Sequence, residues 1–296
     1  MKGPRVSLEH WQVLQAVVEQ GGFAQAAAYL HRSQSSVSYA VARLQEQLGV
    51  PVLEMDGRKA RLTEAGEALL RRSRHLVEEA AALERFAHSL EQGWEPEVRL
   101  VVDAAFPTDL LMSALSRFQP LSQGSRVQLR EVVLSGAEEA LETGSADLVI
   151  GGHVPARFLG EPLIDITFLA VASARHPLHR LGRSINLADL ERELQVVVRD
   201  SGTSRPRDMG WLGAEHRWSV GSIDTAVAAV SRGLGVAWLP EHRIQGLLEQ
   251  GVLGRLPLVE GGSYRTPLYL MFGRAESPGP AARSLADLLK QVVRGE

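Results

Sequence analysis

Residues 23–63, FAQAAAYLHRSQSSVSYAVARLQEQLGVPVLEMDGRKARLT, restrict the possible folds of this 296-residue chain more than any other stretch. The Ala-rich residues 23–30 predict a short helix, and after a turn at His31-Arg32 the hydroxyl of Ser33 can cap a second helix. Gly49, with a proline two residues later, ends this second helix. Its apolar residues form one stripe at helical spacing: Val37, Val41, Leu44 and Leu48.

The face opposite this stripe carries small and polar side chains where an independent surface helix would carry Glu and Lys. These residues are Gln34, Ser35, Ser38, Tyr39, Ala42 and Arg43. Amide and hydroxyl groups can hydrogen bond the edges of bases in a major groove, and a tyrosine can reach a phosphate or a thymine methyl group. The pattern favours a helix that reads DNA, and an ordinary amphipathic helix is the alternative.

The stretch around this helix completes a small unit. An earlier helix is predicted over 8–18, where apolar residues recur at helical spacing. Downstream, residues 52–55 and 59–62 flank Asp56-Gly57, a typical hairpin turn. Basic residues crowd the tip and the return strand of this hairpin: Arg58, Lys59 and Arg61. Such a tip suits contact with phosphates or a minor groove, whereas charge that protects an edge strand is the alternative.

Residues 8–66 resemble the winged helix-turn-helix of the LysR-type transcriptional regulators. The matching segments are AAAYL, SQSSVSYAVARLQEQLG, GRKARLT and the following EAG, in the order and spacing of that family. The resemblance implies that four residues face bases: Gln34, Ser35, Ser38 and Tyr39. It implies that four others meet the DNA backbone or minor groove: Arg43, Arg58, Lys59 and Arg61. Ser35, Tyr39 and Met55 differ from the residues common at these positions in the family.

Residues 64–92 predict one long helix with a heptad repeat of leucines: Leu69, Leu76, Leu83 and Leu90. A small residue stands three positions before each leucine: Gly66, Ser73, Ala80 and Ala87. Because such a seam lets two helices approach closely, the pattern predicts a dimer helix, with packing against its own domain as the alternative. The resemblance implies an antiparallel dimer helix between the DNA-binding and effector parts. A dimer would present two recognition helices to a pseudo-palindromic site, and tetramers are common in the family.

The rest of the chain alternates short apolar runs with helical patterns. Strands are expected over 98–102, 127–132, 146–150, 163–173, 195–198, 236–239 and 268–272, and helices over 110–118, 136–143, 187–194, 222–232 and 281–293. This rhythm predicts α/β structure with parallel strands. The resemblance implies two α/β lobes like those of periplasmic binding proteins, lobe I over about 96–165 and 268–296 and lobe II over about 166–267. The expected fold is therefore α+β overall, with a DNA-binding domain over 1–63, a linker helix over 64–92 and an effector domain over 93–296.

Small ligands bind at the carboxyl ends of parallel strands and in clefts between lobes, and this rule nominates several loops. The candidate effector-binding residues are Ala105, Phe106, Thr108, Ser135, His153, Ser201, Thr203 and Arg205. The hydroxyls of the loop 199–205 and its Arg205 could hold an anion, with a Ser/Gly surface turn as the alternative. Ala104-Ala105-Phe106 replaces the hydroxyls common in the family, which points to a ligand with an apolar or ring surface.

Composition excludes several classes of function. The chain has no cysteine, so disulfides, Cys-ligated zinc and cysteine catalysis are excluded. P-loop, dinucleotide-binding, HExxH and GxSxG motifs are absent, so we expect no cofactor, no metal and no enzymatic activity. There is no run of about 18 apolar residues and no apolar signal-peptide core, from which we expect a cytoplasmic protein without membrane contact. Residues 1–75 hold ten basic and seven acidic residues, a local charge of +3 within a chain of net charge −3.

Two hypotheses of function follow. The first is a LysR-type transcriptional regulator that binds double-stranded DNA as a homodimer or homotetramer, senses a small-molecule effector between two lobes and alters access of RNA polymerase. The alternative is a non-catalytic metabolite-binding protein whose N-terminal module mediates only association. The basic excess of residues 1–75 and the polar helix face favour the first hypothesis.

Overall fold

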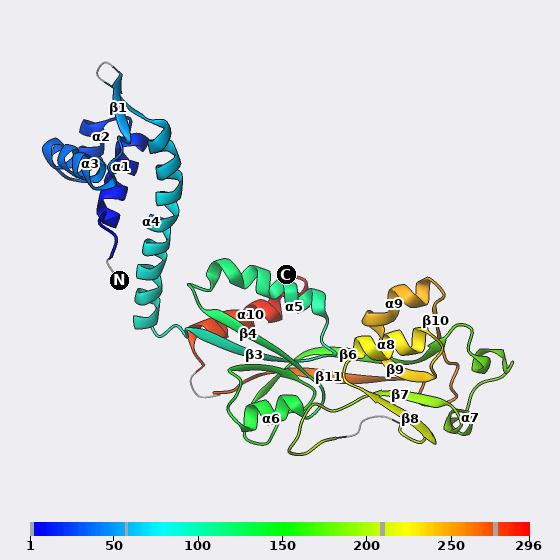
Figure 1. Cartoon of the computed structure of the whole chain (residues 1–296). Coiled ribbons are helices and arrows are strands. Elements are labelled where there is room, and N and C mark those ends of the chain that lie inside the picture. The colour runs from blue at the N-terminus through cyan, green and yellow to red at the C-terminus, as the bar shows by residue number, and fades with distance from the viewer. Residues whose placement is uncertain (1–2, 57–58, 208–210, 275–277) are drawn as a thin grey trace. The chain divides into compact units, whose positions relative to one another are not determined.

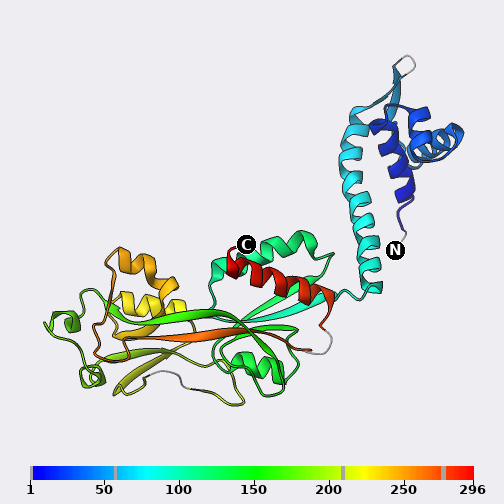
Figure 2. The same cartoon turned by 180° about the vertical axis from the view of Figure 1, so that it is seen from behind.

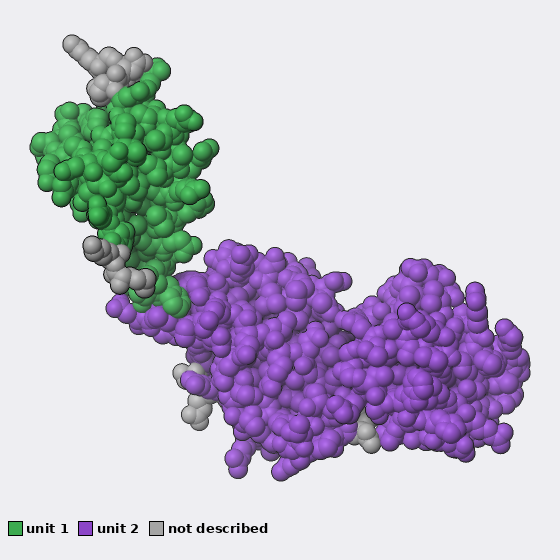
Figure 3. Space-filling view, in the orientation of Figure 1, with its two compact units in different colours: residues 1–89 green, residues 90–296 purple. Residues whose placement is uncertain are grey.

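A computed structural model describes residues 3–56, 59–207, 211–274 and 278–296. The chain divides into two compact units, residues 1–89 and residues 90–296, which Figure 3 shows in different colours. Each unit has its own buried core. Within the described residues, no helix is both long enough and apolar enough to span a bilayer.

Unit 1 begins with three helices, α1 (Leu8–Glu19), α2 (Phe23–Tyr29) and α3 (Gln34–Leu48). The apolar stripe of α3 is buried against α1 and α2, with Val37 and Val41 among its buried residues. The expected caps form, since the Ser33 hydroxyl accepts from the Ser36 amide at 3.2 Å and Gly49 ends α3 in the left-handed conformation with φ 72°. The turn between α2 and α3 places His31 at φ 54°. These local signals set the geometry of the helix-turn-helix.

The hairpin of β1 (Leu53–Asp56) and β2 (Lys59–Leu62) follows α3. The two strands pair antiparallel, and the Gln45 side chain accepts from the Val52 and Leu53 amides at 2.8 and 3.1 Å, which joins the hairpin to α3. Gly57 of the expected turn lies outside the described residues.

The long helix α4 (Glu64–Glu91) closes against this hairpin at Gly66. A Cβ atom at Gly66 would lie 2.0 Å from the Val52 carbonyl oxygen, so only glycine permits this contact. Further along α4 the heptad leucines differ in how far they are buried. Leu69 is half-buried in the core of unit 1, whereas Leu76, Leu83 and Leu90 are 55%, 68% and 42% exposed. An apolar seam on α4 is thus left uncovered in the single chain.

Unit 2 is built on a nine-stranded sheet in the order β4-β3-β5-β11-β6-β9-β7-β8, with β10 paired to β6. The strands are β3 (Glu97–Asp103), β4 (Arg126–Val132), β5 (Leu148–Gly151), β6 (Gly160–Ser173), β7 (Leu194–Val198), β8 (His216–Val220), β9 (Val236–Pro240), β10 (Leu253–Arg255) and β11 (Ser263–Phe272). The outer strands pair parallel, as the alternating pattern predicts. The long central strands β6 and β11 pair antiparallel and run from one lobe into the other (Figure 1).

Helices cover both faces of this sheet. α5 (Thr108–Phe118) and α10 (Pro280–Arg294) lie side by side on one face of the first lobe, and α6 (Gly136–Glu142) lies on the opposite face, as both views show (Figures 1 and 2). The second lobe carries α7 (Leu187–Glu191), α8 (Ile223–Ser231) and α9 (Glu241–Glu249), and short 3-10 turns occur at Gln119–Leu121 and Pro177–Arg180. The expected α+β fold class, with a winged helix-turn-helix, a long helix and a two-lobed effector domain, is confirmed.

Three elements of unit 2 were not expected from the sequence. β8 is an edge strand whose residues are mostly exposed, so it has no apolar periodicity. β10 has only three residues, and α9 buries only Ile244. The expected helix over 187–194 is shorter, because Leu194 already begins β7. In each case the apolar signal is weak or mixed, because edge strands, short elements and surface helices bury few side chains.

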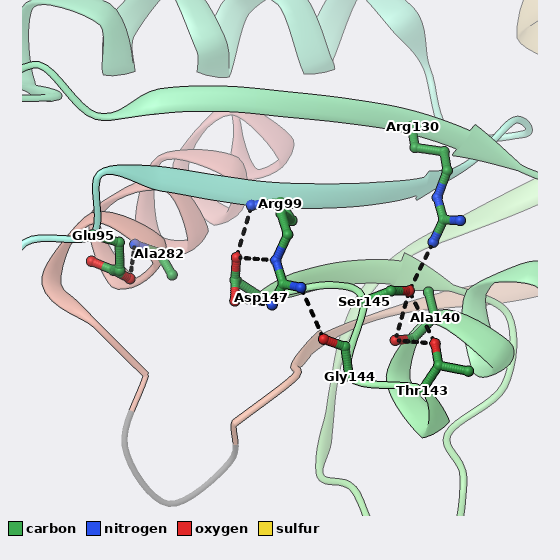
Figure 4. Close-up of polar contacts among 9 residues, drawn as sticks. All are labelled: Glu95, Arg99, Arg130, Ala140, Thr143, Gly144, Ser145, Asp147 and Ala282. Atoms are coloured by element: carbon green, nitrogen blue, oxygen red, sulfur yellow. Dashed lines mark hydrogen bonds and ion pairs between the residues drawn. The ribbon is translucent and has the colours of Figure 1, made fainter.

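Charged side chains fix the start of unit 2 to its end (Figure 4). The Glu95 carboxylate accepts from the Ala281 and Ala282 amides at 2.9 and 3.2 Å and so caps α10 from a position far away in sequence. Nearby, Arg99 donates to both oxygens of Asp147, from Nε at 3.0 Å and from a terminal nitrogen at 2.7 Å. Burial opposes the charge of Asp147, but the hydrogen bonds from Arg99 outweigh it and lower the pKa of this carboxyl.

We predict that Glu95→Ala destabilises unit 2 by about 1 kcal/mol, because the first amides of α10 lose a charged acceptor at the positive end of the helix dipole. For a unit of this size the unfolding midpoint should fall by about 2–4 °C, measured by thermal unfolding of the full chain. Glu97→Ala is the matched control, since the Glu97 carboxylate forms a surface ion pair with the exposed Arg126 at 3.6 Å, a contact of small energy. Equal effects of the two substitutions would contradict the capping role.

Candidate DNA interface and effector cavity

The polar face of α3 is open to solvent in unit 1. Gln34, Ser35, Ser38 and Tyr39 are all exposed, and Tyr39 is 70% exposed although it is aromatic. Ser35 hydrogen bonds the capping hydroxyl of Ser33 at 2.9 Å. The buried stripe on the other side of α3 fixes this orientation, so the four side chains share one accessible surface.

The basic residues beside this face differ in their surroundings. Arg43 is exposed and forms an ion pair with Glu46 one turn later, and the hydrogen bond that it donates to this carboxylate raises the pKa of the guanidinium. Arg61 is exposed on β2. Arg58 lies outside the described residues, and for Lys59 the structure describes only the backbone, within β2.

A cavity of about 250 Å³ lies in unit 2, where the loops after β3, β4 and β5 face the strands of the second lobe. Its floor comes from alternate residues of the two central strands: Ile166, Phe168, Tyr264, Thr266 and Leu268. Further lining residues come from both lobes and include Asp103, Glu138, Gln195, Arg207, Trp211 and Trp238. This position matches the expected ligand cleft at the strand ends.

Four phenylalanine, tyrosine and tryptophan side chains are among the residues that line the cavity. The rings of Phe168 and Tyr264 stack at a centroid distance of 4.9 Å and an interplanar angle of 4°. Trp211 and Trp238 lie 5.8 Å apart on the second-lobe side. The expectation of a site with ring or apolar surface therefore agrees with the lining, although Phe106, from which it was inferred, does not line the cavity.

Of the eight candidate effector residues, Ala105 and His153 line the cavity. The Phe106 side chain instead lies in the buried core of unit 2, because the chain turns inward after Asp103. The Thr108 hydroxyl accepts from Arg243 at 2.8 Å. Arg205 is exposed and lies outside the lining.

The other three candidates hydrogen bond across the lobes. The Ser135 hydroxyl donates to Asp200 at 2.7 Å, and the Ser201 hydroxyl accepts from the Val133 amide at 2.8 Å. The Thr203 hydroxyl and amide donate to Glu139 at 2.7 and 2.6 Å. These groups join the β4–α6 region to the loop after β7. The hydroxyls of Ser135 and Thr203 are thus bonded to the carboxylates of Asp200 and Glu139, and that of Ser201 is bonded to the Val133 backbone.

Arg207 strengthens the same connection at the rim of the cavity. Its two terminal nitrogens donate to the two oxygens of Glu138 at 2.5 and 2.9 Å, a bidentate ion pair between residues of the two lobes. Asp200 accepts from three backbone amides besides the Ser135 hydroxyl: Ser135, Gly202 and Arg207. The lobes are thus held in one arrangement by a network of short polar contacts.

Asp103 is the most perturbed acid beside the cavity. Burial raises its pKa to about 6, against the opposing effect of backbone amides such as that of Ala105, whose nitrogen lies 2.9 Å from the carboxylate. Burial and the nearby Asp103 charge raise the pKa of Tyr264 to about 12. Asp103 is therefore mostly ionised at neutral pH, and the Tyr264 hydroxyl stays protonated.

Sequence reasoning missed most lining residues, among them Gln195 and Tyr264. Gln195 is 2% exposed; its Nε2 donates to the Trp211 carbonyl at 2.5 Å, and its Oε1 has no hydrogen-bond partner among the described residues. A polar residue within the apolar strand LQVVV was the available signal.

Comparison with known proteins agrees with this architecture. The model of the LysR substrate binding domain matches residues 91–294, and that of the bacterial regulatory helix-turn-helix proteins of the lysR family matches residues 8–67. The probable HTH-type transcriptional regulator YhaJ of Escherichia coli K12 is 30% identical over 93% of each chain. The RuBisCO operon transcriptional regulator of Allochromatium vinosum is 29% identical over 98% of this chain and 97% of its own.

Solved structures show the same fold. The full-length LysG of Corynebacterium glutamicum with bound effector Arg is 20% identical, covers 97% of this chain and 98% of its own, and has a TM-score of 0.53. CrgA, a LysR-type regulator of Neisseria meningitidis, is 20% identical, covers 96% of this chain and 98% of its own, and has a TM-score of 0.52.

A helix-turn-helix unit followed by a two-lobed ligand-binding unit defines a DNA-binding transcriptional regulator with an effector domain. The chain belongs to the LysR family of such regulators, which bind DNA and small-molecule effectors and form oligomers. This result favours the regulator hypothesis over that of a metabolite-binding protein with an association module.

We predict that Asp103→Asn changes how stability depends on pH. Since the folded pKa of Asp103 is about 6 and the ordinary value is 3.8, its protonation stabilises the fold fully below pH 3.8, and this stabilisation is lost as pH rises through 6. Relative to Asp103→Asn, the natural protein should lose about 2–3 kcal/mol of stability between pH 4 and pH 7. Urea unfolding at a series of pH values measures the difference. The exposed Glu142→Gln is the control, and parallel pH profiles for the natural protein and Asp103→Asn would contradict the expectation.

Proposed function

We propose that the exposed face of α3 enters the major groove of DNA. Gln34, Ser35, Ser38 and Tyr39 would contact base edges. The adjacent basic residues would contact the backbone or the minor groove: Arg43, Arg58, Lys59 and Arg61. The observation that carries this proposal is the solvent-exposed polar face of α3, with Tyr39 70% exposed opposite an apolar stripe in which Val37, Val41 and Leu44 are buried.

We further propose that α4 joins two chains through its leucine seam. Leu76, Leu83 and Leu90 are exposed in the single chain, and a second copy of α4 could cover them. Pairing of this kind would place two α3 helices on the two halves of a pseudo-palindromic site. Dimers or tetramers built on this contact are the expected assembly.

The cavity of unit 2 is proposed as the effector site. Its rim contains the Glu138–Arg207 ion pair, so a ligand in the cavity would alter the contact that holds the lobes together. We propose that this change reaches promoter DNA through the paired regulator and alters access of RNA polymerase. The protein would act in the cytoplasm as a non-catalytic sensor.

An electrophoretic shift assay with DNA from the region upstream of the protein's own gene tests the DNA proposal. Arg43→Ala should weaken binding to this site and to unrelated DNA alike, and should lower the salt slope of the logarithm of affinity by about 1, because one phosphate contact is lost. Glu46→Gln is the matched control, since it removes the acid that pairs with Arg43 and should leave affinity equal or higher. If Arg43→Ala leaves the salt slope unchanged, Arg43 does not contact the DNA backbone.

Ser38→Ala should instead act on sequence selectivity. The loss of a base contact should cost about 1–3 kcal/mol at the upstream site and leave affinity for unrelated DNA unchanged. If folded natural protein fails to bind either DNA at low salt, the DNA proposal is wrong.

Leu83→Glu should separate the proposed pair of α4 helices, because it places a charge in an apolar seam where each buried leucine contributes about 1.5–3 kcal/mol. Light scattering after gel filtration should then give a smaller mass, approaching the 32.2 kDa of one chain. Glu84→Gln, also exposed on α4 but outside the seam, should leave the mass unchanged. An oligomer that survives Leu83→Glu unaltered would exclude the seam as its contact.

A further inference from the structure

The polar groups that face the cavity differ in whether they have partners. Arg207 is the one lysine or arginine among the described lining residues, and its terminal nitrogens are already bonded to both oxygens of Glu138. An incoming anion would have to share this guanidinium with the Glu138 carboxylate or displace that carboxylate. The cavity therefore offers no free guanidinium or ammonium from the described residues.

Two acceptors, in contrast, are buried beside the cavity without a cation. Gln195 Oε1 has no hydrogen-bond partner among the described residues, and leaving a buried amide oxygen unpaired costs free energy. The Asp103 carboxylate accepts only backbone amides, such as that of Ala105, and the described residues supply it with no ion pair. Asp200 lies near enough to oppose the charge of Asp103 further. The electrostatic potential in this part of the cavity is therefore negative.

The walls add a shape requirement. The stacked pair Phe168–Tyr264 and the pair Trp211–Trp238 line the cavity, and aromatic rings attract both flat apolar rings and cations. The volume of about 250 Å³ lies below the usual range of about 300–1,000 Å³ for drug-sized ligands, so it suits a molecule of about one ring.

We propose that the effector is a small aromatic or heteroaromatic molecule that carries a cationic or multiply N–H-donating group, and that Asp103 and Gln195 accept from that group. This inference rests on the proposed function, in which the cavity is the effector site. It assigns to the site a ligand class opposite in charge to the anion suggested by the hydroxyl loop 199–205. Those hydroxyls are used between the lobes instead.

Three planar probes of equal size test the proposal: benzamidine, benzamide and benzoate, which are cationic, neutral and anionic at pH 7.5. Titration calorimetry with the full chain should give the tightest binding for benzamidine, with benzoate weaker by a factor of at least about ten, which corresponds to about 1.4 kcal/mol. Benzamide should lie between them. Binding of benzoate as tight as that of benzamidine, or no binding of benzamidine, overturns the proposal.

Two variants assign the acceptors. Asp103→Asn should weaken benzamidine by a factor of about ten and change benzamide by less than about threefold, because only the cation loses a charged partner. Gln195→Met keeps the length of the side chain but removes the carbonyl. It should weaken the binding of benzamidine and benzamide, the two N–H donors, and leave the binding of benzoate unchanged. If both variants still prefer benzamidine over benzoate as strongly as the natural protein does, the assignment is wrong. If a variant does not fold, the order of the three probes on the natural protein decides.

The electrophoretic shift experiment separates this inference from the proposed function. Natural protein that binds its upstream DNA but prefers benzoate refutes the ligand class alone. Natural protein that prefers benzamidine but binds no DNA refutes the DNA proposal and leaves the cavity chemistry standing.

Discussion

The antiparallel pairing of β6 with β11 is the contact on which unit 2 depends. Register pairs Phe168 with Tyr264 and Ile166 with Thr266, so both strands contribute to the same floor of the cavity. Because successive side chains alternate between the faces of a sheet, this register sends one set of residues to the cavity and the other to the opposite face. The same two strands carry the sheet from one lobe into the other, so the lobes share backbone hydrogen bonds as well as side-chain contacts (Figure 1).

The side-chain contacts between the lobes complement this rigid pairing. Asp200 accepts hydrogen bonds from Ser135, Gly202 and Arg207. The Arg207 guanidinium in turn donates to Glu138 at the edge of the cavity. Hydrogen bonds to charged groups are stronger than those between neutral groups, yet they are also sensitive to a new charge nearby. A sheet that passes continuously between two lobes, with ionic contacts at its rim, is suited to small changes in lobe geometry when a ligand enters.

In unit 1 the sequence predicted much of the structure. The Ser33 cap, the left-handed Gly49 and the spacing of Val37 and Val41 act within a few residues, so the chain needs no distant contact to place them. In unit 2 the main strands and helices were also predicted, while β8, β10 and α9 were missed because edge strands and short surface helices bury few side chains. The candidate site was predicted less well, and the case of Phe106 shows why. Its loop was correctly placed, but the direction of its side chain depends on how the core fills.

The sequence by itself determined the helix-turn-helix, the leucine seam of α4 and the α/β rhythm, since caps, turns and periodicity are local properties of the chain. Only the tertiary structure decided which residues face the cavity and which close the lobes. Tyr264 meets Phe168 through strand pairing across about a hundred residues, and Ser135 meets Asp200 across a gap of 65. A serine hydroxyl looks the same in sequence whether it awaits a ligand or is bonded to a buried carboxylate. Only the fold shows which partner it has.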